Sequence, residues 1–150
     1  MTFSVFISYS TRDLAEATAL STWIASAGAH PYLAEYSLEP GRPMAANILG
    51  AIKGCDLFLL LWSQSAKDSE WVPQEIGIAH GAGKAIMPIV LQPGIDLPAF
   101  IKDLKYLAVY KDPTTAVQWL QQDVSARVKQ KNMMVLAVIG GLLLFLANSK

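Results

Sequence analysis

The chain has 150 residues, which suffice for one domain with a single hydrophobic core and leave no room for a second domain. Basic and acidic residues number 12 each, and the basic ones are dispersed except near the carboxyl end, which excludes the electrostatic footprint of a nucleic-acid-binding protein. The one cysteine, Cys55, has no partner for an intrachain disulfide, as suits a reducing, cytosolic setting.

Short apolar runs alternate with segments of helical period along the chain. The first run, within "MTFSVFISYS", follows no basic region and precedes no cleavage site, so it predicts a strand rather than a signal peptide. The expected strands are 3–7, 31–34, 56–62, 85–90 and 105–110, and the expected helical segments are 14–27, 44–52, 69–82 and 117–128. This alternation predicts an α/β fold with a parallel sheet and helices on both faces.

Ligands of doubly wound sheets bind beyond the carboxyl ends of the strands. The loops at that edge are expected to begin at Ser8, Glu35, Ser63 and Gln92. The glycines form neither a GxGxxG nor a GxxxxGKS/T cradle, so a phosphate site of those two kinds is not encoded. His30 and His80 pair with no cysteine or serine in a catalytic spacing, and no metal cluster is visible. We therefore expect neither a metal nor a cofactor.

The segment "MMVLAVIGGLLLFLA", 133–147, is uncharged, and its Val, Leu, Ile and Phe residues favour membrane insertion by roughly 3 to 5 kcal/mol. As a helix it would span roughly 22 Å, less than the about 30 Å of a bilayer's hydrocarbon core. Three basic residues precede it and only Lys150 follows, which predicts a tail anchor with a cytoplasmic domain. The alternative is a helix buried in a self-association interface; Gly140 and Gly141 allow close packing in either case. The expected domain covers 1–131 and the apolar helix 132–150.

Four stretches carry a family resemblance: "FISYSTRD" (6–13), "YSLEPGRPMAANILGAI" (36–52), "CDLFLLLWSQSAKDSEW" (55–71) and "EWVPQEIGIA" (70–79). In this order and spacing they resemble the Toll/interleukin-1 receptor (TIR) domain of the short prokaryotic type, over about residues 3–130. The resemblance implies a flavodoxin-like fold with five parallel strands in the order 2-1-3-4-5. It also implies either homotypic assembly as a scaffold or cleavage of NAD+ to nicotinamide and an ADP-ribose product. The family's third box, a Phe-Trp pair, is reduced to "AFI" (99–101).

Glu75 is the candidate catalytic residue. Trp71 and Glu75 are spaced i, i+4, which puts them on one helix face, and Pro73 confines the helix start, with Ser69 as the expected N-cap. Nicotinamide leaves NAD+ as a neutral group, so a single carboxylate can suffice where an ordinary glycoside needs two. By the resemblance, Glu75 would stabilise the oxocarbenium ion and Trp71 would stack on the substrate. Taken alone, Glu75 is better explained as a solvated carboxylate favoured by the helix dipole; its place in the family's Trp-x-x-x-Glu helix reverses that preference.

Two loops complete the predicted site. After the first strand, Ser10, Thr11 and Arg12 offer donors to a pyrophosphate, although turn and capping chemistry, with Asp13 as N-cap, explains them equally well. Ser63 is placed to contact a ligand, or simply to end its strand. By the resemblance, a stiff loop contacts a neighbouring subunit and covers the nucleotide; its alternative is a plain exposed turn. That loop comprises Glu39, Pro40, Gly41, Arg42 and Pro43.

The leading hypothesis is therefore a TIR-type NAD+ nucleosidase or ADP-ribose cyclase that uses NAD+ as substrate. It would be activated by self-assembly into a homo-oligomer or filament, held at a membrane, and act in prokaryotic immunity. The alternative is a non-enzymatic scaffold that recruits other TIR proteins. A phosphoacceptor receiver shares the fold but needs an acidic residue after the third strand, where this chain has Ser63.

Overall fold

The computed structural model describes residues 2–34 and 46–149. Its centre is a parallel sheet with the strand order β2-β1-β3-β4-β5. This is the order implied by the resemblance, and the fold class is confirmed. The strands are β1 (Ser4–Ser8), β2 (His30–Leu33), β3 (Leu57–Trp62), β4 (Ile86–Val90) and β5 (Leu107–Ala108).

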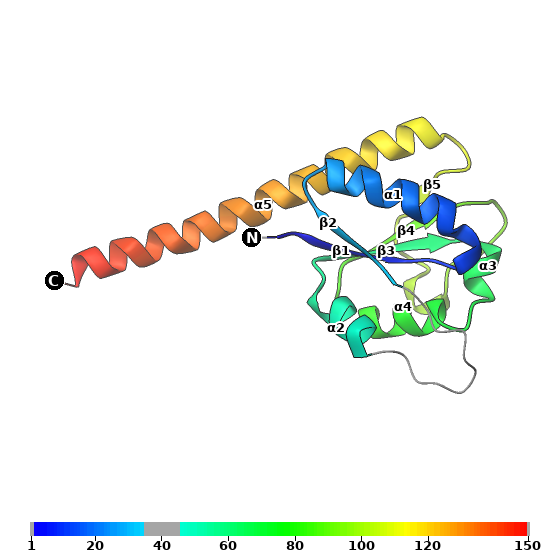
Figure 1. Cartoon of the computed structure of the whole chain (residues 1–150), viewed down its shortest axis with the longest axis horizontal. Coiled ribbons are helices and arrows are strands. Elements are labelled where there is room, and N and C mark those ends of the chain that lie inside the picture. The colour runs from blue at the N-terminus through cyan, green and yellow to red at the C-terminus, as the bar shows by residue number, and fades with distance from the viewer. Residues whose placement is uncertain (1, 35–45, 150) are drawn as a thin grey trace.

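Helices cover both faces of this sheet, as Figure 1 shows. One layer holds α1 (Leu14–Ser26) and the first half of α5 (Pro113–Asn148), and the other holds α2 (Ala46–Gly54) and α4 (Val72–Gly81). The short helix α3 (Gln64–Lys67) follows β3, and two 3₁₀ turns, η1 (Thr11–Asp13) and η2 (Ala99–Ile101), lie in loops. This three-layer arrangement gives the sheet a hydrophobic cluster on each side.

Strand β3 shows why its apolar run belongs in the middle of the sheet. All six residues are buried, and successive side chains point to opposite faces. Leu57, Leu59 and Leu61 join the cluster under α1 and α5, whereas Phe58, Leu60 and Trp62 join the cluster over α2 and α4. A strand apolar on both faces is thus stable only between two helical layers.

The edges of the sheet depart most from the expected bounds. Strand β5 has only two residues, because it pairs with β4 only at Ile89↔Leu107 and Val90↔Ala108. At the other edge α1 ends before Gly28, whose φ of +90° turns the chain into β2. Residues with a Cβ rarely adopt that conformation, so glycine is required there.

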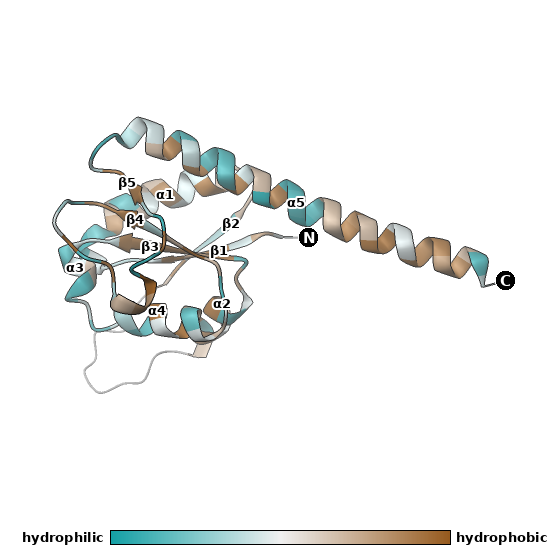
Figure 2. Cartoon of the chain, turned by 180° about the vertical axis from the view of Figure 1, so that it is seen from behind, coloured by the Kyte–Doolittle hydropathy of each residue, from teal (hydrophilic) through white to brown (hydrophobic). Residues whose placement is uncertain are grey.

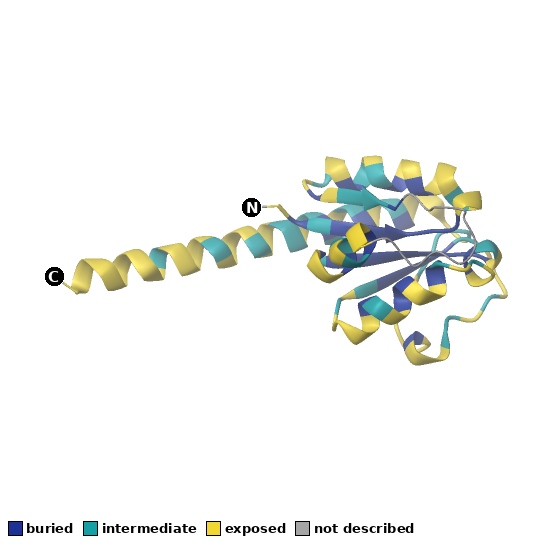
Figure 3. Cartoon of the chain, turned by 60° about the horizontal axis from the view of Figure 1, so that its bottom comes forward, coloured by how far each residue is buried: buried dark blue, intermediate teal, exposed yellow. Residues whose placement is uncertain are grey.

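Helix α5 is continuous for 36 residues, and no proline or glycine interrupts it between Val117 and Lys131. Its first half buries Ala116, Leu120 and Val124 against the sheet. Its second half extends beyond the domain, predominantly apolar in Figure 2 and exposed in Figure 3. By length and composition this helix can cross a membrane, and its most apolar stretch is 0% buried.

Candidate functional site

Glu75 lies in the first turns of α4 with its side chain fully buried. The helix presents Val72, Ile76 and Ala79 to the sheet, which carries Glu75 into the interior with them. The interpretation of Glu75 as a solvated carboxylate is therefore wrong. Removing a carboxylate from water is unfavourable unless it is hydrogen-bonded, so its position calls for donors.

Ser8 is one such donor. Its Oγ donates to Glu75 Oε1 at 2.7 Å, and its own side chain is 0% exposed. Because Ser8 ends β1, this bond holds the carboxylate at the carboxyl edge of the sheet, where the fold predicts the site. From the sequence alone, Ser8 is expected only to begin a loop. The available signal was a serine following the apolar run of β1 beside the expected ligand edge.

A hydrogen bond between Ser63 and Asp13 joins the loops that follow β3 and β1. Ser63 Oγ donates to Asp13 Oδ2 at 2.6 Å and accepts a bond from the backbone N–H of Ala66 at 3.0 Å. Asp13 stands at the N-cap position of α1 without a side-chain cap bond, so its expected capping role is wrong because Ser63 takes that carboxylate. Ser10 Oγ accepts from the backbone N–H of Arg12 at 3.3 Å.

These contacts bring the predicted substrate-binding residues to one edge of the sheet. Ser10 is buried, whereas Thr11 and Arg12 are exposed on η1. At the same edge a cavity of about 550 Å³ opens beside the end of β4. Its lining includes Gln92, Asp96, Lys102, Tyr106 and Tyr110.

Trp71 stands one position before the helix rather than inside its first turn. Helix α4 begins at Val72, with Trp71 at the N-cap position. Ser69, the expected N-cap, stands two residues earlier, and its hydroxyl makes capping bonds by accepting the N–H groups of Trp71 and Val72, at 3.2 and 3.3 Å. The Trp71 carbonyl accepts the Glu75 N–H at 3.0 Å, so the two residues remain one turn apart. The Trp71 side chain is partly exposed.

The remaining predictions concern the assembly loop, η2, Cys55 and metal binding. The assembly loop, 39–43, lies outside the described residues. The residues "AFI" form η2, where the Phe100 ring contacts His80 with 5.1 Å between centroids. Burial raises the pKa of the Cys55 thiol, and nearby Lys84 lowers it by a smaller amount. Within 2–34 and 46–149, no group of three or more His, Cys, Asp or Glu side chains could hold a metal ion.

The family model of the TIR domain matches residues 5–124. The chain belongs to the TIR domain family. A comparison with curated protein sequences finds no match. The expected domain boundary at residue 131 stays a prediction, since the family match ends within the first half of α5.

Solved structures support the TIR fold. The TIR domain of the Toll-related receptor TRR-2 from Hydra magnipapillata is similar with a TM-score of 0.67 and 23% identity, over 82% of this chain and 98% of that one. The TIR domains of the activated Roq1 resistosome, which recognises the pathogen effector XopQ, are similar with a TM-score of 0.51 and 14% identity. The match covers 83% of this chain and 84% of that one. The CMP N-glycosidase BcmB of Clostridium botulinum is similar with a TM-score of 0.54 and 19% identity. The match covers 79% of this chain and 98% of that one. At these identities the likeness concerns the fold alone.

Proposed function

We propose that this TIR protein cleaves NAD+ at its nicotinamide bond, as a nucleosidase or an ADP-ribose cyclase, with Glu75 as the catalytic residue. The observation that carries the proposal is a fully buried carboxylate at the ligand edge of the sheet, bonded to Ser8 at 2.7 Å. A carboxylate in such surroundings stabilises positive charge more strongly than one in water, because little solvent screens it.

Cleavage of the nicotinamide bond needs few protein groups besides this carboxylate. Nicotinamide departs as a neutral molecule, and positive charge develops on the ribose as an oxocarbenium ion. Glu75 would stabilise that ion and accept hydrogen bonds from the ribose hydroxyls. Trp71 would stack on the substrate, and Ser10, Thr11, Arg12 and Ser63 would contact its polar groups. The fold shared with a CMP N-glycosidase makes CMP a second compound to test.

Self-assembly is the proposed activator. A homo-oligomer or filament formed through TIR contacts would bring a neighbour's surface against the substrate, with Glu39, Pro40, Gly41, Arg42 and Pro43 as the proposed contact loop. Its biological setting would be prokaryotic immune signalling. No sequence beyond the TIR domain and the apolar helix is needed for such a mechanism, since crowding on a membrane raises the local concentration.

Nicotinamide release from NAD+ by concentrated protein tests the enzyme. Glu75→Gln is the sharpest variant, because its amide oxygen still accepts from Ser8 while the charge is removed. We expect a loss of about 100-fold or more, the range for removing one electrostatic stabiliser. Glu70→Gln is the matched control, since Glu70 is exposed just before the same helix. Equal turnover by Glu75→Gln and the unchanged chain would exclude Glu75 as the catalyst.

A non-enzymatic scaffold is the second candidate. The Ser8 bond favours it in one respect, because it gives Glu75 a structural partner whether or not catalysis occurs. An assembled protein that binds TIR partners, yet releases no nicotinamide from NAD+ and no base from CMP, would establish the scaffold. Partner binding unaffected by Glu75→Gln would complete that case.

The apolar half of α5 is proposed as a single-pass tail anchor with the TIR domain in the cytoplasm. Its most apolar stretch is 0% buried, which leaves its apolar surface for lipid. Extraction of membranes with alkaline carbonate should leave the chain in the pellet. Leu143→Arg should move it to the supernatant, because a central arginine costs about 3 kcal/mol of insertion.

A further inference from the structure

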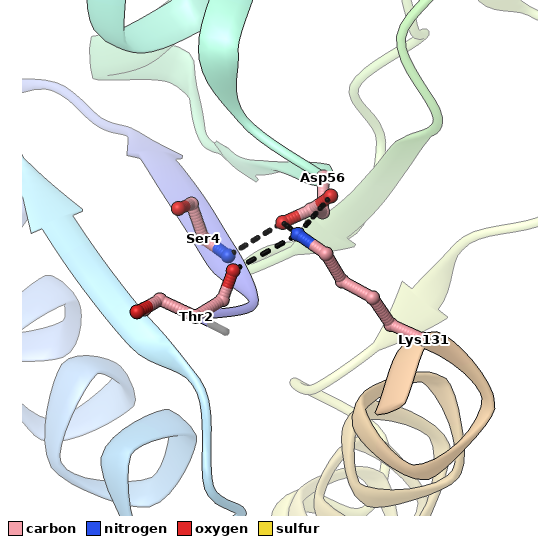
Figure 4. Close-up of polar contacts among 4 residues, drawn as sticks. All are labelled: Thr2, Ser4, Asp56 and Lys131. Atoms are coloured by element: carbon pink, nitrogen blue, oxygen red, sulfur yellow. Dashed lines mark hydrogen bonds and ion pairs between the residues drawn. The ribbon is translucent and has the colours of Figure 1, made fainter. Parts of the chain in front are cut away.

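Lys131 joins the anchor to the domain. Its Nζ lies 2.9 and 3.0 Å from the two carboxylate oxygens of Asp56, and donates to the Thr2 carbonyl at 2.9 Å (Figure 4). Asp56 also accepts from the backbone N–H of Ser4 at 2.8 Å. Thus one side chain of α5 contacts the chain just before both β1 and β3. The joint is only partly exposed, which reduces its screening by water.

These contacts fix where the helix leaves the domain. Thr2 and Asp56 precede β1 and β3, so Lys131 stands level with the amino-terminal edge of the sheet. The uncharged segment begins two residues later at Met133. Figure 1 accordingly shows the second half of α5 extending from the side of the domain where the N-terminus lies. A bilayer around that segment would meet this edge of the sheet.

Basic residues gather at that edge. Lys53 lies in the last turn of α2, Lys84 precedes β4, and Lys129 lies about half a turn before Lys131. Among the described residues these three lysines form no ion pair, whereas Arg127 and Lys131 pair with Asp123 and Asp56. The opposite edge mixes signs. There the basic side chains are Arg12, Lys67, Lys102 and Lys111, and the acidic ones are Asp13, Asp68, Glu70, Asp96 and Asp112.

The corner between helix and edge is hollow and largely apolar. A cavity of about 630 Å³ opens there. Phe3 forms part of one wall, and Met134, Val135, Val138 and Ile139 form part of the other. The polar lining consists of Gln130, Arg127, and Lys131 with its partner Asp56. Apolar side chains next to basic ones match the interface of a bilayer, where acyl chains meet charged headgroups.

We propose that the amino-terminal edge of the sheet is a membrane-docking face for anionic phospholipids. Lys53, Lys84 and Lys129 contact headgroups, lipid fills the corner beside Phe3, and the Lys131–Asp56 joint holds the domain in this orientation. The inference rests on the proposed anchor. The candidate active site then points away from the bilayer. The length of α5 within the domain indicates how far the carboxyl edge of the sheet stands from the bilayer, because the 18 steps from Pro113 to Lys131 rise about 27 Å.

The test uses the full chain on a Cys55→Ala background, added to vesicles of phosphatidylcholine with or without phosphatidylserine. A fluorophore is placed at Gly54→Cys, where an added Cβ meets nothing within 4 Å, or at exposed Thr114→Cys near the far edge. Lipids spin-labelled on the headgroup should quench the probe at 54 and leave the probe at 114 unquenched, because quenching requires proximity.

Charge variants supply the second measurement. Replacing Lys53, Lys84 and Lys129 by glutamine should lower the preference for phosphatidylserine vesicles by about fivefold for each lysine removed. The matched control replaces Lys67, Lys102 and Lys111, with the same change of charge, and should keep the preference.

The outcomes separate the two proposals. Binding is measured by flotation of the vesicles in a density gradient. A chain that floats with neither kind of vesicle refutes the anchor itself. A chain that floats, but has both probes quenched alike or neither quenched, retains the anchor and overturns the docking face. Equal loss of lipid preference in the two triple variants also overturns it, since only the total charge would then matter.

Discussion

Ser8→Ala tests the hydrogen bond that holds the candidate catalytic carboxylate. The bond from Ser8 Oγ to Glu75 Oε1 is 2.7 Å long, and both side chains are 0% exposed. A bond to a charged group contributes about 1.5 to 3 kcal/mol, and water cannot easily replace a buried donor. For a chain of this size, 1 kcal/mol shifts the melting temperature by about 2 to 4 °C, so Ser8→Ala should lower it by about 3 to 12 °C.

The assay is equilibrium unfolding of the whole chain in one detergent, followed by circular dichroism. Ser26→Ala is the control, because its hydroxyl donates only to the Thr22 carbonyl on the exposed side of α1, and it should change stability by less than about 0.5 kcal/mol. A double-mutant cycle with Glu75→Ala isolates the pair and should give a coupling of about 1.5 to 3 kcal/mol. Coupling near zero would refute the view that Ser8 stabilises the carboxylate.

Three further predictions concern other parts of the chain. Cys55 should react with iodoacetamide only after unfolding, because burial raises its pKa and shields the thiol; fast labelling of the native chain would contradict this. Asp112 has a pKa lowered from 3.8 by bonds from Thr115, so Asp112→Ala should be less stable than the unchanged chain at neutral pH. That difference should vanish in unfolding curves as pH falls below 3.8 through the folded-state pKa, and a constant difference would disprove the linkage. Gly28→Ala should destabilise by about 1 to 2 kcal/mol at φ +90°, whereas Gly77→Ala inside α4 should stabilise by about 0.5 to 1 kcal/mol in the same denaturant titration; like signs would refute the backbone argument.

The central elements could be predicted from the sequence because their signals are local. A strand such as β3, apolar on both faces, has a stable place only between helical layers, and Pro73 restricts the start of α4 whatever the rest of the fold does. The strand order came from the family resemblance, because periodicity alone says nothing about which strands are neighbours. The length of β5 was overestimated, since its extent depends on how much of the edge of β4 is available for pairing.

The site was predicted only in part because its contacts are long-range. Glu75 was singled out from the sequence as the candidate catalytic residue, and its role stays a prediction. Its burial and its bond to Ser8, 67 residues away in the chain, could not be predicted. Asp13 has the composition of a helix cap, yet its carboxylate serves Ser63, which is 50 residues away. In each case a local preference was overridden by a partner from another loop, and no local pattern records which partner that is.

An unbroken α5 also makes the TIR domain and the apolar segment 133–147 share one helical phase. Each step along the helix turns it by about 100°, so the ten steps from Lys131 to Gly141 fix which side of the TIR domain stands above the glycine face of the apolar segment. Inserting a single residue after Asn132 would rotate the domain about the axis of α5 by that angle, without changing any side chain of the candidate active site. If the apolar segments of two chains meet through Gly140 and Gly141, the number of residues between Lys131 and Gly141 sets the angle at which their candidate active sites face each other.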